Sequence, residues 1–294
     1  MTKRMLSFAI SLAIAAVGFA QQPKVDLGGK EATIPITVRF LRAVLPVMVN
    51  GQGPYDFYFD PGAQGLGIEQ SLVETLKLPP VGKAALKSGG KAAGGSEIIA
   101  IEKLEFGTAS IANAQAIAFP RATFGGAGQP VGMISPTVFS GYLVTLDYPG
   151  KQLKLQSGKL PAVNNKDVFG YLDRGTIPAL RIDVAGIAVD AQLDTNSNGG
   201  LSLPRSFAKR VPLMEPPKEA GKVRTDKGEF TFADATIKGV VKIGKFTLEN
   251  PPVRFTDVIK RGNIGHDILK NYAITIDIRQ RRFKLDQASG SEEK

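Results

Sequence analysis

Two aspartates stand in similar surroundings far apart in the chain. Asp60 follows the apolar run 57–59 and Asp194 follows the run 191–193, so each carboxylate is expected at the end of a strand. Small residues come next, and they let the backbone approach closely and donate N–H groups to a carboxylate. These loop residues are Pro61, Gly62 and Ala63 after the first aspartate, and Thr195, Asn196 and Ser197 after the second.

A single aspartate after a strand is usually a turn former. Two aspartates at equivalent points of a duplicated module can instead be brought together by a pseudo-twofold axis. Two carboxylates in contact cannot both ionise cheaply, so such a pair shares a proton. One of them can then deprotonate a water while the other donates to a carbonyl. The pattern therefore predicts hydrolysis with Asp60 and Asp194 as the catalytic pair.

The residue inventory agrees with chemistry that needs neither a metal nor a cofactor. The chain has no cysteine, which excludes disulfides, thiolate catalysis and cysteine-ligated metals. Its one histidine, His266, rules out multi-histidine metal sites, and we expect it at the surface or beside the site. The net charge is +10, but the basic residues are scattered without interleaved aromatics. We therefore expect no nucleic-acid partner.

The chain contains a repeat with fixed order and spacing. In each copy a glycine precedes a tyrosine by 10 positions and a threonine by 13. The equivalents are Gly132, Tyr142 and Thr145 in the first copy, and Gly262, Tyr272 and Thr275 in the second. This repeat predicts a mainly β fold of two duplicated modules with short helices, related by a pseudo-twofold axis.

The start of the chain is typical of an export signal. A basic leader precedes an apolar run that is short for a membrane span of about 20 residues, and small residues follow it. We expect export to the periplasm or outside the cell, with no integral membrane segment after cleavage. The predicted order is signal peptide 1–20, disordered N-terminus 21–33, first module 34–155, linker 156–170, second module 171–286 and disordered tail 287–294.

Two glycine-containing stretches are candidate flaps over a cleft that has Asp60 and Asp194 at its floor. An ordinary surface loop is the alternative for the first stretch. The flap candidates are Gly89, Gly90, Gly94, Gly95, Asp226 and Gly228.

On these residues the chain resembles the aspartic proteases, in particular the bacterial retropepsin-like family with two modules in one chain. The resemblance covers roughly residues 34–285. The tetrapeptide Asp60-Pro61-Gly62-Ala63 stands where the family has Asp-Thr/Ser-Gly-Ala/Ser/Thr, and Asp194-Thr195-Asn196-Ser197 is the second copy. Ile264-Gly265 resembles the family's apolar segment that threads behind the active loop, and Ile134-Ser135 is its counterpart in the first half. The resemblance therefore implies that these four residues support the two aspartate loops. The resemblance implies acid-protease-like modules and an exported endopeptidase that cleaves a peptide or protein substrate. It also implies a monomer, because one chain carries both halves.

Three residues depart from the family's pattern. Pro61 replaces a hydroxyl residue that hydrogen-bonds across the two loops, and Asn196 and Ser135 each replace a glycine. Thr195 would then buttress only its own loop. The alternative is therefore a catalytically impaired member of the fold that binds extended peptides or envelope polymers in the cleft. A structural envelope protein with an unused cleft is a third interpretation.

Overall fold

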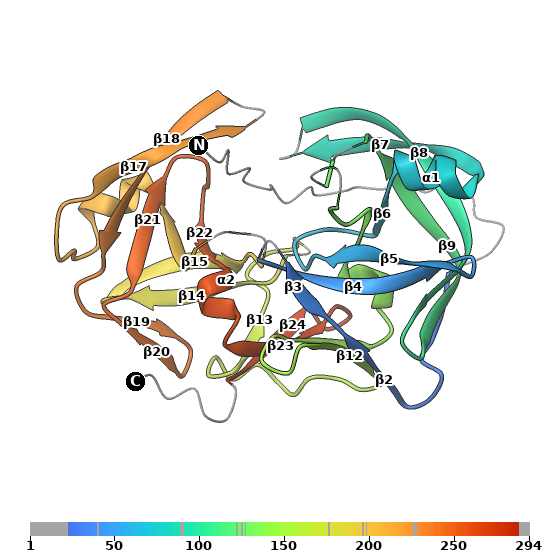
Figure 1. Ribbon diagram of the computed structural model, residues 1–294. Helices are drawn as coiled ribbons and strands as arrows, with labels where there is room; N and C mark the ends of the chain where they lie inside the picture. Colours follow the sequence, from blue (N-terminus) through green and yellow to red (C-terminus); the bar gives the residue numbers. More distant parts are fainter. Residues whose placement is uncertain are drawn as a thin grey trace. The chain divides into compact units, whose positions relative to one another are not determined.

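The computed structural model is built mainly from strands, as the sequence predicts (Figure 1). It describes residues 23–39, 41–88, 91–121, 123–124, 126, 128–175, 177–195, 197, 199–225 and 228–287. The predicted signal peptide 1–20 lies outside this part, as does the predicted tail from 288 onward. Within it, no helix is long and apolar enough to cross a membrane.

The described residues cluster into two compact units. The N-terminal unit comprises residues 23–159 together with Thr275–Gln280, and the C-terminal unit comprises Leu160–Ile274 and residues 281–287. A short segment near the end of the chain therefore packs with the N-terminal unit. Each unit is described separately below.

The larger sheet of the N-terminal unit has the order β1-β9-β6-β10-β5-β4-β8-β7, with β3 beside β4. A further hairpin, β11–β12, pairs with β2 through β12. The strands are β1 (Lys24–Asp26), β2 (Glu31–Pro35), β3 (Thr37–Arg39), β4 (Arg42–Val49), β5 (Gln52–Phe59), β6 (Leu66–Glu69), β7 (Pro80–Ser88), β8 (Lys91–Phe106), β9 (Ala109–Phe119), β10 (Gly132–Ile134), β11 (Leu143–Asp147) and β12 (Gln152–Gln156). The helices are α1 (Gln70–Leu76) and the 3₁₀ helix η1 (Pro136–Phe139).

The main sheet of the C-terminal unit has the order β17-β18-β21-β16-β22-β15-β14-β19-β20, and β13 pairs with β24. The strands are β13 (Val168–Gly170), β14 (Ala179–Val184), β15 (Ile187–Leu193), β16 (Leu201–Pro204), β17 (Lys218–Thr225), β18 (Gly228–Thr236), β19 (Val240–Ile243), β20 (Phe246–Glu249), β21 (Pro252–Thr256), β22 (Gly262–Ile264), β23 (Tyr272–Asp277) and β24 (Arg282–Gln287). The helices are the 3₁₀ helix η2 (Arg205–Lys209) and α2 (His266–Leu269). The division between the units falls within β23.

Each aspartate follows a β-hairpin that is closed by a tight turn. Asn50 and Gly51 join β4 to β5 with φ angles of 49° and 74°. Ala185 and Gly186 join β14 to β15 with φ angles of 49° and 89°. Two successive positive φ angles give the mirror-image turn that suits the twist of a hairpin.

Aromatic side chains anchor the strand that ends at Asp60. Phe57 and Phe59 are fully buried and alternate with Tyr58 along β5. Phe106 and Phe139 are also fully buried, and their rings meet edge to face with centroids 5.6 Å apart. Burying the rings of Phe57 and Phe59 contributes about 2–3 kcal/mol each, which anchors β5 next to Asp60.

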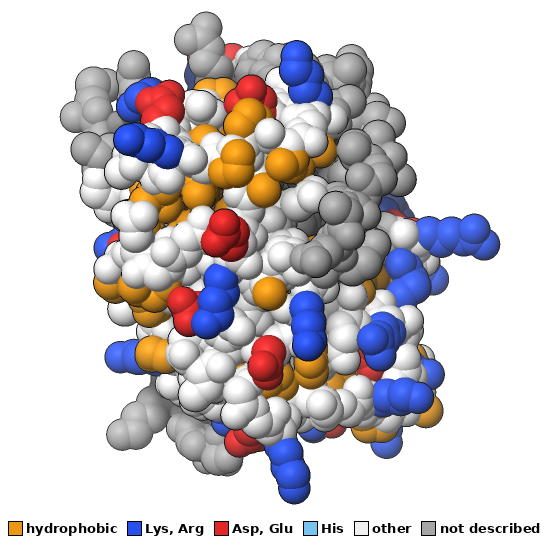
Figure 2. Space-filling model, turned by 90° about the vertical axis from the view of Figure 1, so that its right-hand side faces the viewer, with side chains coloured by type: hydrophobic (Ala, Val, Ile, Leu, Met, Phe, Trp, Pro, Cys, Tyr) orange, Lys and Arg blue, Asp and Glu red, His pale blue; other side chains and the backbone are white. Residues whose placement is uncertain are grey.

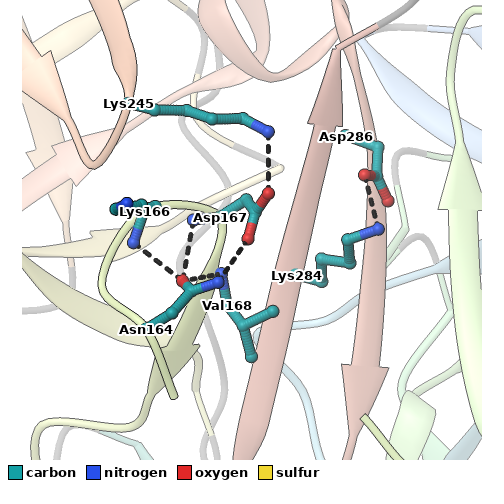
Figure 3. A network of polar contacts seen from close by, with 7 residues as sticks. All are labelled: Asn164, Lys166, Asp167, Val168, Lys245, Lys284 and Asp286. Carbon is teal, nitrogen blue, oxygen red and sulfur yellow. Dashed lines mark hydrogen bonds and ion pairs between the residues drawn. The ribbon is translucent and has the colours of Figure 1, made fainter. Parts of the chain in front are cut away.

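Two segments that lie outside the predicted modules, the N-terminus at 21–33 and the linker at 156–170, contain strands. Part of the predicted disordered N-terminus forms β1, which pairs with β9, and the start of β2, which pairs with β12. The predicted linker includes β13. Within this linker, the side-chain oxygen of Asn164 accepts hydrogen bonds from the backbone N–H groups of residues 166–168 (Figure 3). The Asp167 carboxylate accepts a hydrogen bond from Nζ of Lys245 at 2.7 Å. In the linker, the polar side chains of Asn164 and Asp167 are thus used in hydrogen bonds at the surface.

The charged side chains are scattered over the face seen in Figure 2, where acidic groups lie among the lysines and arginines. This agrees with the even spread of charge in the sequence. A mixed surface of this kind favours solubility.

Candidate active site

The Asp60 loop is closed by backbone hydrogen bonds. The backbone N–H of Asp60 donates to the Ile134 carbonyl at 2.9 Å, and the N–H of Ala63 donates to the Asp60 carbonyl at 3.2 Å. The N–H of Gly62 donates to Oδ1 of Asp60 at 2.8 Å. Asp60 is only 7% exposed, so the backbone hydrogen bonds fix the loop at a buried strand end, and the Gly62 N–H contacts its carboxylate.

Strand β10 threads between the two strands that flank the Asp60 loop. It runs parallel to β5, with Gly132 opposite Phe57, and antiparallel to β6. A Cβ atom at Gly132 would lie 2.2 Å from the Phe57 ring. The glycine of the first repeat is therefore required where the backbone passes the buried ring.

Ser135 supports the loop even though it stands where the family pattern has glycine. Its backbone N–H donates to the Gly65 carbonyl at 3.1 Å, and its buried hydroxyl lies 2.5 Å from Oγ1 of Thr137. Oγ1 of Thr137 accepts from the Gly65 N–H at 2.8 Å. The Thr137 N–H also donates to the Ser135 hydroxyl at 3.3 Å, which caps η1. The sequence analysis did not identify Thr137. The one feature that could have indicated its role is its position two residues after Ser135, the serine that replaces the family's glycine.

The Asp194 loop repeats this local arrangement. The backbone N–H of Asp194 donates to the Ile264 carbonyl at 2.9 Å, and the N–H of Ser197 donates to the Asp194 carbonyl at 3.0 Å. Strand β22 runs parallel to β15, with Leu193 opposite Ile264, and antiparallel to β16. Each predicted aspartate thus lies beside the predicted support residues of its own half.

Gly265 is confined by the backbone of the Asp194 loop. Its N–H donates to the Gly200 carbonyl at 2.7 Å, and a Cβ atom there would lie 2.4 Å from the Gly199 carbonyl oxygen. The next residue, His266, donates its N–H to the Ser197 carbonyl at 3.1 Å and begins α2. The loop therefore packs directly on the start of this helix.

Asn263 contacts the second carboxylate, and sequence reasoning missed it. Its side-chain amide donates to Oδ2 of Asp194 at 2.9 Å, and the residue is 7% exposed. The equivalent position in β10 is Met133, by the register of the two strands. The side chain of a methionine cannot donate a hydrogen bond. An asparagine in a short buried strand needs a hydrogen-bond partner, and this could have indicated its role from the sequence.

The residues after the aspartates differ between the loops. The Thr195 side chain is 2% exposed, and within the described part of the chain its hydroxyl has no hydrogen-bond partner. Pro61 offers neither a hydroxyl nor an N–H group. Asn196 lies outside the described residues.

His266 is buried and does not lie at the surface. Burial lowers the pKa of its imidazole, with a smaller opposing effect of Asp267 and a lowering effect of Lys270. The imidazole is therefore held toward its neutral form. Among the described residues, no group of three or more histidine, aspartate or glutamate side chains is placed to hold a metal ion.

Both flap candidates fall on hairpins. In the first, β7 pairs with β8, and Gly94 and Gly95 lie within β8 instead of in a loop. Gly89 and Gly90 lie outside the described residues. In the second, β17 pairs with β18 up to Thr225 opposite Gly228, and Asp226 lies outside the described residues.

Residues 45–134 match the family model of the aspartyl proteases. The match runs from β4 to the end of β10, so it includes the Asp60 loop and the strand threaded behind it. It supports an aspartyl protease family and a peptidase-type function. No curated protein matches the chain.

Proposed function

We propose that the protein is an exported aspartic-type endopeptidase in which Asp60 and Asp194 act together on an activated water. The observation that carries this proposal is the family match over the Asp60 loop, together with a second loop of the same construction at Asp194. In both loops the aspartate N–H donates at 2.9 Å to the carbonyl of an isoleucine in the threaded strand. The second loop could then supply the other carboxylate that this chemistry needs.

A contact between repeat equivalents supports the proposed duplication. Thr145 and Thr275 occupy the same place in the two copies of the sequence repeat, 13 positions after Gly132 and Gly262. Their hydroxyl oxygens lie 2.9 Å apart. The two copies of the repeat thus contribute equivalent threonines to one contact, which supports a duplication within the chain.

In the proposed reaction, one carboxylate takes a proton from water, and the water oxygen bonds to the carbonyl carbon of the peptide. The other carboxyl group donates its proton to the carbonyl oxygen. Collapse of the tetrahedral intermediate breaks the C–N bond, and the amine leaves with a proton supplied by the pair. The Gly62 N–H on Asp60 and the Asn263 amide on Asp194 would orient the two carboxylates.

The proposal is tested by cleavage of a peptide library at acid pH by the wild-type protein and the Asp60→Asn variant. We expect cleavage by the wild-type protein that a pepstatin-type inhibitor blocks, and loss of cleavage in the variant. Cleavage that persists in Asp60→Asn would exclude the paired mechanism.

One observation favours the alternative of an impaired member that binds extended peptides or envelope polymers. The buried Thr195 hydroxyl lacks a hydrogen-bond partner among the described residues, and Pro61 has no hydroxyl to offer. A loop pair without this hydrogen bond would be less rigid, and catalysis depends on preorganised geometry. Tight binding of library peptides without cleavage at any pH would support this alternative.

Export is part of the proposal and rests on the leader sequence at residues 1–20. We place the protein in the periplasm or outside the cell. We also propose that it acts as a monomer on peptide or protein substrates. Cell fractionation and the N-terminal sequence of the mature protein would test the location and the cleavage site.

A further inference from the structure

An open basic pocket lies in the C-terminal unit, and none of its lining residues takes part in the loop hydrogen bonds described above. It has a volume of about 420 Å³ and is formed by β14, β15, η2 and the segment that precedes β22. Four cations line it, together with one carboxylate and one aromatic ring. These residues are Arg181, Arg210, Lys260, Arg261, Asp190 and Phe207.

The acidic groups of the pocket do not balance its cations. Nε of Arg181 lies 2.8 Å from Oδ1 of Asp190, and Arg261 lies 2.6 Å from a carboxylate oxygen of Asp173. Arg210 and Lys260 have no ion-pair partner among the residues that the structure describes. Two cations are thus left to attract a ligand carboxylate.

Three of the cations are already held in place. Asp190 and Asp173 orient Arg181 and Arg261, and the guanidinium of Arg210 lies over the Phe207 ring, 4.5 Å from its centroid. A guanidinium fixed before binding loses less conformational entropy when it pairs with a carboxylate. The Phe207 ring adds an apolar wall that suits the methylene groups of an acidic side chain.

Strand β15 connects this pocket to the Asp194 loop. Side chains alternate along the strand, so Asp190 and Asp194 are on the same face, and four positions correspond to about 13 Å of extended chain. The backbone ladder continues through this stretch, because Leu193 donates its N–H to the Pro178 carbonyl at 2.9 Å. An extended peptide spans the same distance with about four residues.

We propose that this pocket binds an acidic side chain of the peptide substrate, about four residues from the bond that is cleaved. The proposal rests on the proposed peptidase function and narrows the substrate class to peptides with an aspartate or glutamate at that distance. Arg210 and Lys260 make the new ion pairs, while Asp190 and Asp173 keep the other two guanidiniums in position.

Binding is measured separately from cleavage in the full chain carrying Asp60→Asn, which removes one of the two proposed catalytic carboxylates. The probes are two fluorescent peptides that differ only in a Glu-Glu or a Gln-Gln pair, compared by anisotropy at about pH 6, where glutamate is ionised. We expect the Glu-Glu peptide to bind on the order of fivefold more tightly, with a preference that shrinks as salt is added.

Two double variants that lose the same charge test whether the preference for the Glu-Glu peptide depends on the pocket residues. In Arg210→Gln/Lys260→Gln, the ratio of the affinities for the Glu-Glu and Gln-Gln peptides should fall close to one. Lys238→Gln/Lys242→Gln removes two exposed lysines outside the pocket, and it should leave that ratio unchanged. An equal loss in both double variants, or no preference in the parent protein, would overturn the pocket proposal. The two proposals can also fail separately. If only the pocket variant loses the preference for Glu-Glu, and the wild-type protein cleaves no peptide, the pocket proposal stands and the peptidase function is overturned.

Discussion

Gly265 has no room for a side chain. A Cβ atom there would lie 2.4 Å from the Gly199 carbonyl oxygen and 3.1 Å from those of Gly200 and Ser197. We predict that Gly265→Ala lowers the free energy of unfolding by about 1–3 kcal/mol, because backbone atoms must move to accommodate it.

Gly200→Ala is the matched control, since a Cβ atom there meets only Ile268 side-chain atoms at 3.6 Å or more. We expect Gly200→Ala to lower the free energy of unfolding much less than Gly265→Ala does. Urea denaturation of both variants measures the difference. Equal stability of the two variants would show that the Asp194 loop is less confined than these distances indicate.

His266 gives the molecule a pH-dependent stability. Burial lowers the pKa of the folded imidazole, so the unfolded chain binds its proton more readily. As the pH falls below the unfolded value of about 6.5, this residue should progressively destabilise the folded state. We predict that His266→Gln, which does not titrate, loses less stability than the wild type on acidification. Thermal unfolding of both proteins across this pH range tests it, and parallel curves would contradict the assignment.

At the residue scale, the sequence identifies the groups that repeat and misses those that do not. Asp60 and Asp194 follow similar strands and precede small residues, so the sequence places them at the ends of those strands. Asn263 and Thr137 have no counterpart in the other half, and their contacts depend on strand register and loop closure. Sequence spacing alone does not determine such contacts.

At the scale of elements, the segment before β13 is tied to the turn between β19 and β20. Lys245 and Asn164 donate to the Asp167 carboxylate and lower its pKa from 3.8 to about 2 (Figure 3). A lowered pKa stabilises the fold above the unfolded pKa, and this contribution disappears as the pH falls through the folded value. The contact therefore remains ionised over most of the acid range.

We predict that Asp167→Asn is less stable than the wild type near neutral pH and that the difference vanishes at about pH 2. The exposed Glu249→Gln serves as the control, because it removes one charge without removing this contact. Urea midpoints at several pH values measure the effect. A difference that persists undiminished at the lowest pH would show that the carboxylate's charge is not its cause.

The elements were predictable where turn chemistry fixes the backbone. Asn50-Gly51 and Ala185-Gly186 adopt the successive positive φ angles that join hairpins. The stretch 91–95 left a hairpin and an ordinary surface loop open, because its small residues suit both, and in the structure it forms the start of β8. Pairing with β7 decides this structure, and a partner strand is not visible in the local sequence.

At the scale of the whole molecule, the chain returns to its first unit near its end. Thr275–Gln280 clusters with the N-terminal unit, and the Thr275 hydroxyl meets that of Thr145 at 2.9 Å. We predict that Thr145→Val and Thr275→Val each lower the free energy of unfolding by about 1 kcal/mol. Their double variant should cost less than the sum, because both remove the same hydrogen bond. Additive losses in urea denaturation would mean that the threonines do not interact.

The most direct test of the pairing compares peptide cleavage by Asp60→Asn, Asp194→Asn and the variant with both substitutions. If the two carboxylates act as one unit, each single variant should lose activity by on the order of 10²–10⁴-fold. The double variant should then lose little more, because removing either member already disables the pair. A single variant with wild-type activity, or losses that multiply in the double variant, would contradict a shared site.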